Sequence, residues 1–365
     1  MTKKQKNEKT KEQKHQRTNA PTDEAPALVI ELNGVIVAVT DGKPRILVVQ
    51  HPDHPGNAAE QNDSSLPDAL PFGPLDPAAD RTLELGLRRW VKERTGMELG
   101  YVEQLYTFGD RNRDPEELEG GPRVISVPYL ALVKEKQLSG MGTARWRDWY
   151  EFFPWEDWLQ RHSSVIDEEI APALENWIQN DPNPESRNRR RERIEIAFGL
   201  SGTPWDEEKV LDRYELLYET GLVPERARDR ELGIEYERES PVSSVELPTE
   251  SSGVSLVRPM ALDHRRILAT AMGRLRGKIK YRPVVFELLP RNFTLLQLQR
   301  VVEALAGVGL HKQNFRRFVE KGGLVEETGQ WETKTGGRPA KLFCFRREVL
   351  RERPAPGVGL PGARH

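Results

Sequence analysis

The C-terminal part of the chain contains the stretch FTLLQLQRVVEALAGVGLHKQNFRRFVEKGGLVEETGQWETKTGGRPAKLFCF, which spans residues 293–345. Thr294 is a suitable N-cap for a helix over 295–306, and a second helix begins after the glycine-bearing turn GVGL. A helix, a short turn and a second helix form the helix-turn-helix pattern. The residues that follow read as a strand, a glycine-rich turn and another strand. We therefore predict a helix-turn-helix followed by a β-hairpin wing.

The second helix, HKQNFRRFVEKGG (311–323), separates apolar from basic side chains. Phe315, Phe318 and Val319 form the predicted inward stripe, because they recur at helical spacing. The outward cations and amides suit a major groove, since arginine can bind guanine and asparagine or glutamine can bind adenine through two hydrogen bonds. A winged helix that contacts only protein is the alternative. The predicted DNA contacts of this helix and of the wing are His311, Lys312, Gln313, Asn314, Arg316, Arg317, Lys334 and Arg338.

The sequence upstream of Phe293 extends this module. HRRILATAMGRLRGKI (264–279) predicts a helix, and VVFELL (284–289) predicts a short strand. We therefore place the winged helix-turn-helix DNA-binding domain at residues 262–350. The predicted apolar side of the first helix consists of Ile267, Leu268, Ala271, Leu275 and Ile279.

Formal charge is distributed unevenly along the chain. Residues 262–350 contain 18 Lys and Arg against 8 Asp and Glu, whereas residues 25–261 contain 27 against 44. A basic module joined to an acidic one indicates that only the basic module binds a polyanion. The alternative is that charge is distributed unevenly over solvated surfaces and has no such function. We predict that residues 1–25 are a disordered basic tail and that 351–365 are a flexible tail.

The N-terminal part predicts a mixed sheet with one good helix. ALVIELNGVIVAV and RILVVQHP form a predicted hairpin around the turn TDGKP, within residues 27–52. Strands are predicted again at YVEQLYTF (101–108) and VISVPYLALV (124–133). The helix is RTLELGLRRWVKERTG (81–96), where Gly96 is a natural stop. Residues 53–72 have turn composition and are predicted to form a loop.

The middle of the chain is charged and rich in helix signals. The tryptophan-rich stretch RWRDWYEFFPWEDWLQRH closes the first domain and is predicted to pack a helix against the sheet or to line a protomer contact. After it we predict a charged helical insertion and linker over 163–261, with helices at IDEEIAPALENWIQ and DEEKVLDRYELLYETG and a linker at ESPVSSVELPTESSGVS. The cluster ESRNRRRERIE either contacts DNA or is a solvated helix face.

Cysteine content and hydropathy limit the cellular context. Cys344 is the single cysteine, which excludes an intramolecular disulfide. No apolar run approaches the roughly 20 residues of a membrane-spanning helix. The lysine-rich N-terminus has no apolar run behind its charges, so it is not a secretory signal. We therefore predict a cytoplasmic protein without a membrane partner.

These motifs resemble those of the Nudix-related transcriptional regulators of NAD metabolism. The winged-helix part resembles the family through ILATAMGRLRGKIKYRPVVFELLP, FTLLQLQRVVEALAG, NFRR and GGRPAKLF, within residues 262–345. LPFGPLDP, the helix ending in ERTG, EQLYTFGDRNRDP and VISVPYLALV are similar to the family's Nudix domain. The resemblance implies an α+β fold, with a Nudix-like α/β/α sandwich at 26–162 for ligand sensing, followed by the winged helix.

The chain departs from active Nudix hydrolases at the catalytic box. Their box carries several carboxylates that hold a divalent metal ion on a pyrophosphate. Here RRWVKERTG places Trp90 where the first glutamate belongs and Arg94 at one position of the following glutamate pair, and the spacing from Gly73 is longer by two residues. We therefore predict no catalytic residue, no bound metal and a fold kept for ligand binding. The degenerate box comprises Gly73, Arg89, Trp90, Glu93, Arg94 and Gly96.

The family resemblance implies that the ligand is ADP-ribose or another NAD-derived nucleotide, which releases a repressor from its operator, and that no cofactor is required. The fragment YTFGDRNRD suits the lip of an anion site, with Arg111 and Arg113 as phosphate donors. A merely charged turn is the alternative. The predicted ligand-binding residues are Tyr106, Phe108, Asp110, Arg111 and Arg113.

Together these features predict a transcriptional regulator, a repressor by resemblance, that binds double-stranded operator DNA and a nucleotide effector. A homodimer would match a palindromic operator. The rival hypothesis is a Nudix hydrolase of nucleoside diphosphate derivatives with an accessory nucleic-acid-binding domain.

Overall fold

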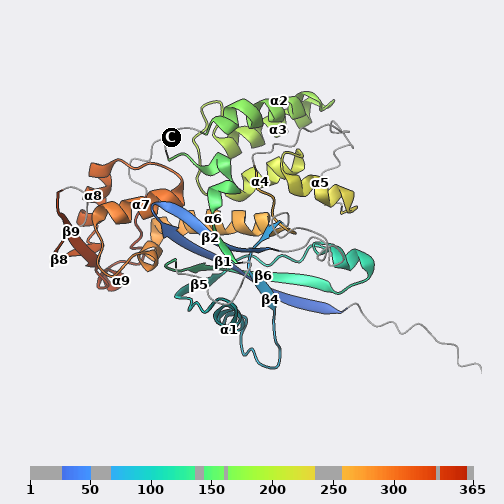
Figure 1. The fold of residues 1–365 in the computed structure, drawn as a ribbon. Coiled ribbons are helices and arrows are strands. Elements are labelled where there is room, and N and C mark those ends of the chain that lie inside the picture. The colour runs from blue at the N-terminus through green and yellow to red at the C-terminus, as the bar shows by residue number, and fades with distance from the viewer. Residues whose placement is uncertain are drawn as a thin grey trace, which may run out of the picture.

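A mixed β-sheet lies between helices in the computed structural model of the protein (Figure 1). Helix α1 covers one side of this sheet, α6 and helices α2 to α5 lie on the other, and the winged helix is at one end (Figure 1). The predicted α+β fold is confirmed, with a helix-covered sheet domain followed by a winged helix. The structure describes residues 27–50, 67–135, 144–159, 163–234, 257–333 and 338–359.

The sheet is seven-stranded, with the order β3-β2-β1-β6-β5 and with β4 and β7 paired to β1 and β2. The predicted hairpin of β1 and β2 is confirmed, and Asp41 and Gly42 at its turn have φ angles of 53° and 74°, as a tight hairpin turn requires. Strands β1 and β6 run parallel, from Leu28 opposite Arg123 to Val37 opposite Leu132. The strands are β1 (Leu28–Thr40), β2 (Lys43–Gln50), β3 (Asp68–Ala69), β4 (Phe72–Pro74), β5 (Tyr101–Gln104), β6 (Arg123–Leu132) and β7 (Arg145–Asp148).

Alternate residues of β1 are buried on opposite faces of the sheet. Leu32, Ile36 and Ala38 pack in the cluster that contains Leu87 of α1 (Leu83–Thr95). Helix α1 is the predicted helix, with Thr82 as its N-cap and Gly96 as its left-handed C-cap. Val35 and Val37, the intervening residues, belong instead to a core shared with the insertion and the winged helix. The second face of the sheet is therefore covered by residues much later in the chain.

The insertion is a packed helical layer. Both predicted helices are confirmed. The first is a π-helical turn (Ile166–Ile170) that continues as α2 (Ala171–Gln179), and the second is α4 (Val210–Glu219). Two more helices, α3 (Pro184–Phe198) and α5 (Pro224–Glu231), were not predicted as packed elements. The arginine-rich cluster lies on α3, where Arg190 is buried, stacks 4.0 Å from the centre of the Trp177 ring and pairs with Asp181 at 3.0 Å. The predicted linker lies outside the described residues.

A buried carboxylate joins this layer to helix α6 (His264–Tyr281). Glu156 accepts hydrogen bonds from Arg213 of α4 and from Arg276 of α6, and all three side chains are fully buried. Burial alone would raise the pKa of Glu156, but the two guanidinium charges outweigh it and lower that pKa. The carboxylate therefore remains charged inside the core.

The tryptophan-rich stretch has the packing role that the sequence predicts. It forms β7 and two short 3₁₀ helices, Trp149–Glu151 and Pro154–Glu156. Trp149, Phe152, Phe153 and Trp155 are almost completely buried in the shared core. The aromatic rings thus pack the helical layers against the sheet.

The winged helix begins with a correction to the prediction. Residues 284–288 form a 3₁₀ helix and not a strand, because Val285 and Leu288 are buried on one side in a helical rather than an alternating pattern. Phe293 and Phe343 then exchange backbone hydrogen bonds of 2.9 and 2.8 Å, which fixes the wing against the helices. The remaining predicted elements are confirmed as α7 (Leu295–Ala306), α8 (Lys312–Lys321), β8 (Val325–Glu332) and β9 (Ala340–Phe345).

The C-terminal segment is more ordered than predicted. A short helix, α9 (Val349–Glu352), is followed by residues that lie against α6. Val358 is fully buried, and its backbone N–H donates to the Ile279 carbonyl at 2.9 Å. The prediction of a flexible tail is therefore wrong up to residue 359, because apolar contacts and a backbone hydrogen bond hold this part of it.

Candidate DNA interface and effector site

Helix α8 presents one apolar and one basic side. Phe315 and Val319 are fully buried, and they dock the helix on the winged-helix core. Phe318 is 40% exposed, so its predicted place in the inward stripe is wrong. Phe318 lies at the border of the stripe, where its ring approaches Gly359 of the C-terminal segment.

The predicted DNA contacts on α8 are accessible. His311, Lys312, Gln313, Arg316 and Arg317 are exposed, and Asn314 is half-buried. Arg317 lies 3.4 Å from the Asn314 amide oxygen, a long hydrogen bond at the surface. In the wing Arg338 is exposed, whereas Lys334 lies outside the described residues. These assignments remain predictions.

Polar side chains fix both ends of α7, and Gln297, Gln299 and Glu303 among them were not predicted. Thr294 and Gln297 form a capping box at the start of α7. Gln299 donates to the Leu310 carbonyl at 3.2 Å, and Glu303 accepts from the Leu310 backbone N–H at 2.8 Å. The α7 side chains thus hold the segment that leads into α8, which orients the basic face.

The predicted effector loop is partly exposed and partly structural. Tyr106 is 71% exposed and contacts Phe108 edge to face at 5.5 Å, whereas Phe108 is buried and exchanges backbone hydrogen bonds with Ser126. Asp110 and Arg111 are exposed. Their side chains can reach a ligand from the rim of the sheet, while Phe108 anchors the loop.

Arg113 requires a correction. Its side chain is completely buried and donates to both carboxylate oxygens of Asp263, at 3.1 and 2.6 Å. Burial alone would raise the pKa of Asp263, but the charge and hydrogen bonds of Arg113 outweigh it, so the pKa is lowered. Arg113 therefore links the loop after β5 to the residue that precedes α6, and its guanidinium is not at the surface where the predicted phosphate donor would lie. Its role as a ligand contact stays a prediction.

A buried polar cluster surrounds this ion pair, and no sequence motif identified it. Asn33 donates to Glu31 at 3.1 Å and lies 3.4 Å from His264, and Ser126 donates to Asn33. His264 Nδ1 accepts from the Leu70 backbone N–H at 3.0 Å. Burial raises the pKa of Glu31 to about 7, although Arg113 and Asn33 act in the opposite direction. The first turn of α6 is thus tied to the sheet through polar contacts.

Several residues of the predicted degenerate Nudix box contact one another or Asp80. Arg89 binds both oxygens of Asp80 at 2.8 Å and also pairs with Glu93 at 3.0 Å. The Trp90 indole lies so close to Gly73 that a Cβ there would meet its Nε1 at 2.0 Å. Gly96 ends the helix, and Arg94 is exposed next to it.

These side chains do not fit a divalent cation, which requires several converging oxygen ligands. An arginine already occupies the oxygens of Asp80 and contacts Glu93, and an indole fills the space beside Gly73. Across the described residues, no group of three or more His, Cys, Asp or Glu is arranged to hold a metal ion.

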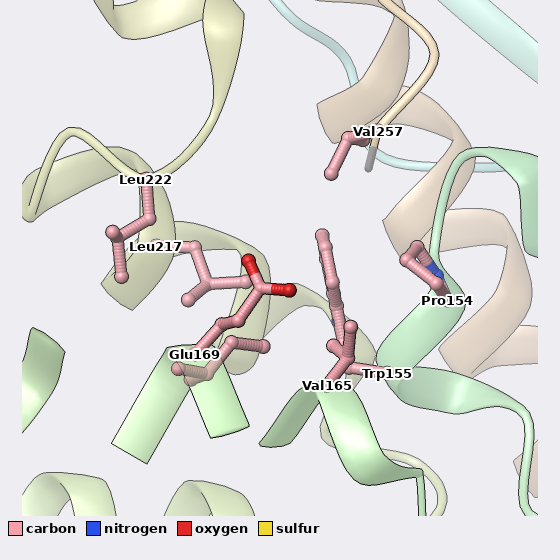
Figure 2. Close-up of a pocket in the computed structure, with 8 residues that line it drawn as sticks. Pro154, Trp155, Val165, Glu169, Leu217, Leu222 and Val257 are labelled. Carbon is pink, nitrogen blue, oxygen red and sulfur yellow. The ribbon is translucent and has the colours of Figure 1, made fainter. Parts of the chain in front are cut away.

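A small hollow lies between the insertion and the tryptophan-rich stretch (Figure 2). Trp155, Val165 and Leu217 line it, and the Glu169 carboxylate points between apolar side chains (Figure 2). Its volume of about 10 Å³ corresponds to a single water molecule at most. A nucleotide does not fit there, so this hollow is a packing gap.

The chain is similar to several known proteins. A family model described as the NrtR DNA-binding winged helix domain matches residues 285–345. Shewanella oneidensis NrtR complexed with a 27mer DNA has a TM-score of 0.49 and 21% identity, covering 88% of this chain and 95% of that one. For a MutT/nudix family protein from Enterococcus faecalis the TM-score is 0.47 at 17% identity, with 90% of each chain covered.

The sequence relationship extends over most of the chain. The ADPR responsive transcriptional repressor NtrR of Acinetobacter baylyi is 41% identical over 320 residues, which cover 88% of this chain and 83% of that protein. An identity of this size over nearly the whole length includes the sheet domain as well as the winged helix. The chain therefore belongs to the family of the ADPR responsive transcriptional repressor NtrR.

Proposed function

We propose that the protein is a transcriptional repressor that binds operator DNA through α8 and the wing and responds to ADP-ribose or a related NAD-derived nucleotide. The observation that carries this proposal is the division of α8, where Phe315 and Val319 are buried while Arg316 and Arg317 are exposed. A helix with this division can lie in the major groove and present cations to bases and phosphates. The relative in Acinetobacter is a repressor that responds to ADPR.

The sheet domain, in this proposal, binds its nucleotide without hydrolysing it and requires no cofactor. Arg89 bound to Asp80 and Glu93, and the indole of Trp90 against Gly73, support this view, because they occupy the place of a metal cradle. The exposed side chains of Tyr106, Asp110 and Arg111 are the proposed ligand contacts.

The proposed regulator is a cytoplasmic homodimer, since a two-fold symmetric protein matches a palindromic operator. No helix in the described parts of the chain combines the length and apolar character needed to cross a membrane. Its expected partners are double-stranded DNA, a nucleotide and a second copy of the chain.

Coupling between ligand and DNA requires an element that both can bias, and α6 has the right contacts. Its N-terminus follows Asp263, which binds Arg113 from the effector loop. Farther along the helix, Arg276 donates to the Leu305 carbonyl of α7 at 3.1 Å. A ligand that shifts the loop would therefore move α6 against the DNA-binding helices. For this to control DNA binding, the ligand must bind the DNA-competent and the DNA-incompetent conformation with different affinity.

Fluorescence anisotropy tests the proposal with an operator enriched from a pool of random duplexes. ADP-ribose is expected to weaken operator binding by about 5- to 150-fold, and operator DNA should weaken ADP-ribose binding by the same factor. AMP release from ADP-ribose with Mg²⁺ or Mn²⁺ should stay near background. Failure of the full chain to bind any duplex would overturn the proposal, and vigorous metal-dependent hydrolysis would favour the hydrolase hypothesis.

A further inference from the structure

A basic groove runs along one flank of α8. It has a volume of about 400 Å³, and four residues of α8 line it: Asn314, Arg317, Phe318 and Lys321. Arg353 and Gly357, which come from the segment after α9, also line it. Three cations from two separate segments thus face one hollow on the predicted recognition helix.

Residues 349–359, here named the C-terminal arm, are held firmly in this position. Glu352 pairs with Arg346 at 2.7 Å, and the Pro354 carbonyl accepts from Arg282 at 3.2 Å. Gly357 lies so close to α6 that a Cβ there would be 2.1 Å from the Lys280 carbonyl oxygen. These contacts with Arg346, Arg282 and Lys280, none of which lines the groove, place Arg353 beside α8.

The position of the groove identifies its ligand. A helix with its side chains is about 10–12 Å wide and the major groove of B-DNA is about 12 Å wide, so the flanks of an inserted helix lie against the phosphate ridges. Asn314, Arg317, Phe318 and Lys321 follow one flank at helical spacing. A cation on this flank therefore meets the phosphodiester backbone more readily than the base edges.

We propose that the C-terminal arm completes a phosphate-binding groove on α8, in which Arg317, Lys321 and Arg353 hold a backbone phosphate of the bound DNA. This inference rests on the proposed function. It adds a DNA contact from outside the helix-turn-helix and the wing. Such a contact carries no sequence information, and it strengthens operator and random DNA equally.

The salt dependence of DNA binding tests the inference with the full chain and a random-sequence duplex. Each phosphate contact contributes about 0.9 to the slope of log affinity against log salt, so Arg353→Ala should lower the slope by up to about 0.9 for each engaged groove. At 150 mM salt this change corresponds to about a 5-fold loss of affinity per groove. Arg351→Ala, on the exposed side of α9, is the matched control and should leave the slope unchanged.

A second variant distinguishes the effect of the Arg353 charge from the effect of the position of the C-terminal arm. Gly357→Ala keeps every charge but has no room beside Lys280, so it should displace the arm and lower the slope as Arg353→Ala does. Equal slopes for the unmodified chain and both variants would refute the groove. A loss in Arg353→Ala without a loss in Gly357→Ala would show that the position of the arm does not matter, and an equal loss in Arg351→Ala would indicate diffuse charge. Either result would also overturn the groove. Absence of any duplex binding by the unmodified chain would instead refute the proposed function.

Discussion

Arg113 and Asp263 form a buried two-point ion pair, although 150 positions of sequence separate them. Arg113 belongs to the loop after β5, and Asp263 precedes the helix that leads to the DNA reader. The pair is therefore a direct contact between the proposed effector side and the proposed DNA side of the molecule.

Replacing Arg113 by alanine should destabilise the fold. The change leaves the Asp263 carboxylate buried without its cation, which typically costs about 3–5 kcal/mol. Urea unfolding at pH 7 measures this loss. Arg111→Ala, an exposed arginine in the same loop, should change the free energy of unfolding by no more than about 0.5 kcal/mol. A stable Arg113→Ala variant that has lost nucleotide binding would instead return Arg113 to the role of a ligand contact.

Glu31 should make stability fall as the pH rises. Its pKa is about 7 in the folded protein against 4.5 in the unfolded chain, so the folded state binds more protons between these values. The free energy of unfolding should therefore decrease from pH 4.5 to above pH 7, by about 2–4 kcal/mol from this group. Glu31→Gln keeps a carbonyl acceptor for Asn33 and should remove this component. Parallel stability curves for the two proteins between pH 4.5 and 8 would contradict the assignment.

Arg316 and the wing should affect DNA binding differently. Arg316→Ala should reduce discrimination at particular base pairs of the operator by about 1–3 kcal/mol. Lys334→Ala, at the predicted wing tip, should weaken operator and random DNA alike and flatten the salt dependence. Mobility shifts with both duplexes provide the measurement. Arg230→Ala, on α5, is the control, and unchanged binding in both test variants would refute the interface.

Restoring two glutamates should not restore catalysis. In the double variant Trp90→Glu and Arg94→Glu, the first carboxylate replaces an indole buried against Gly73, while Arg89 still binds Asp80. The extra length between Gly73 and the helix also remains. AMP release from ADP-ribose with Mg²⁺ should therefore stay near background, with the unmodified protein as reference. Rapid turnover by the variant would show that the two substitutions alone had silenced a hydrolase.

Glu156→Gln should lower the stability of the insertion and of the winged helix together. It leaves Arg213 and Arg276 without their shared carboxylate in a fully buried site, at an expected cost of about 3–5 kcal/mol. Asp157→Asn, at the exposed neighbouring position, should be almost neutral. Calorimetry should show one unfolding transition at a lower temperature. If only a minor transition shifted, the insertion would unfold independently of the rest.

Local patterns in the sequence predicted the elements well. The apolar spacing of Phe315 and Val319 predicts the buried side of α8, and Thr294 and Gly96 mark helix ends through their own backbone chemistry. Such signals lie within a few residues of the structure they determine. They also explain the error at residues 284–288, since a short apolar run fits a helical turn as well as a strand.

The candidate sites depend on partners that local patterns do not reveal. From the sequence alone Arg113 is predicted to be a surface donor, because its partner Asp263 is 150 positions away. Asn33 and His264 are likewise in contact although 231 positions separate them. The ordered C-terminal arm depends on backbone contacts with α6, which composition cannot signal. The sequence thus predicts the basic face of α8, while burial of the polar cluster follows only from tertiary packing.

One face of the sheet is covered by residues that are translated late, and this affects folding during synthesis. Val35 and Val37 emerge from the ribosome early, but their face shares a core with α6, which begins at His264. At roughly 5–20 residues per second, translation from the end of β2 to α6 takes on the order of 10–40 s. During that time an apolar sheet face is available to chaperones or to other nascent chains. Pulse proteolysis of stalled nascent chains should show protection of β1 only after α6 has left the exit tunnel.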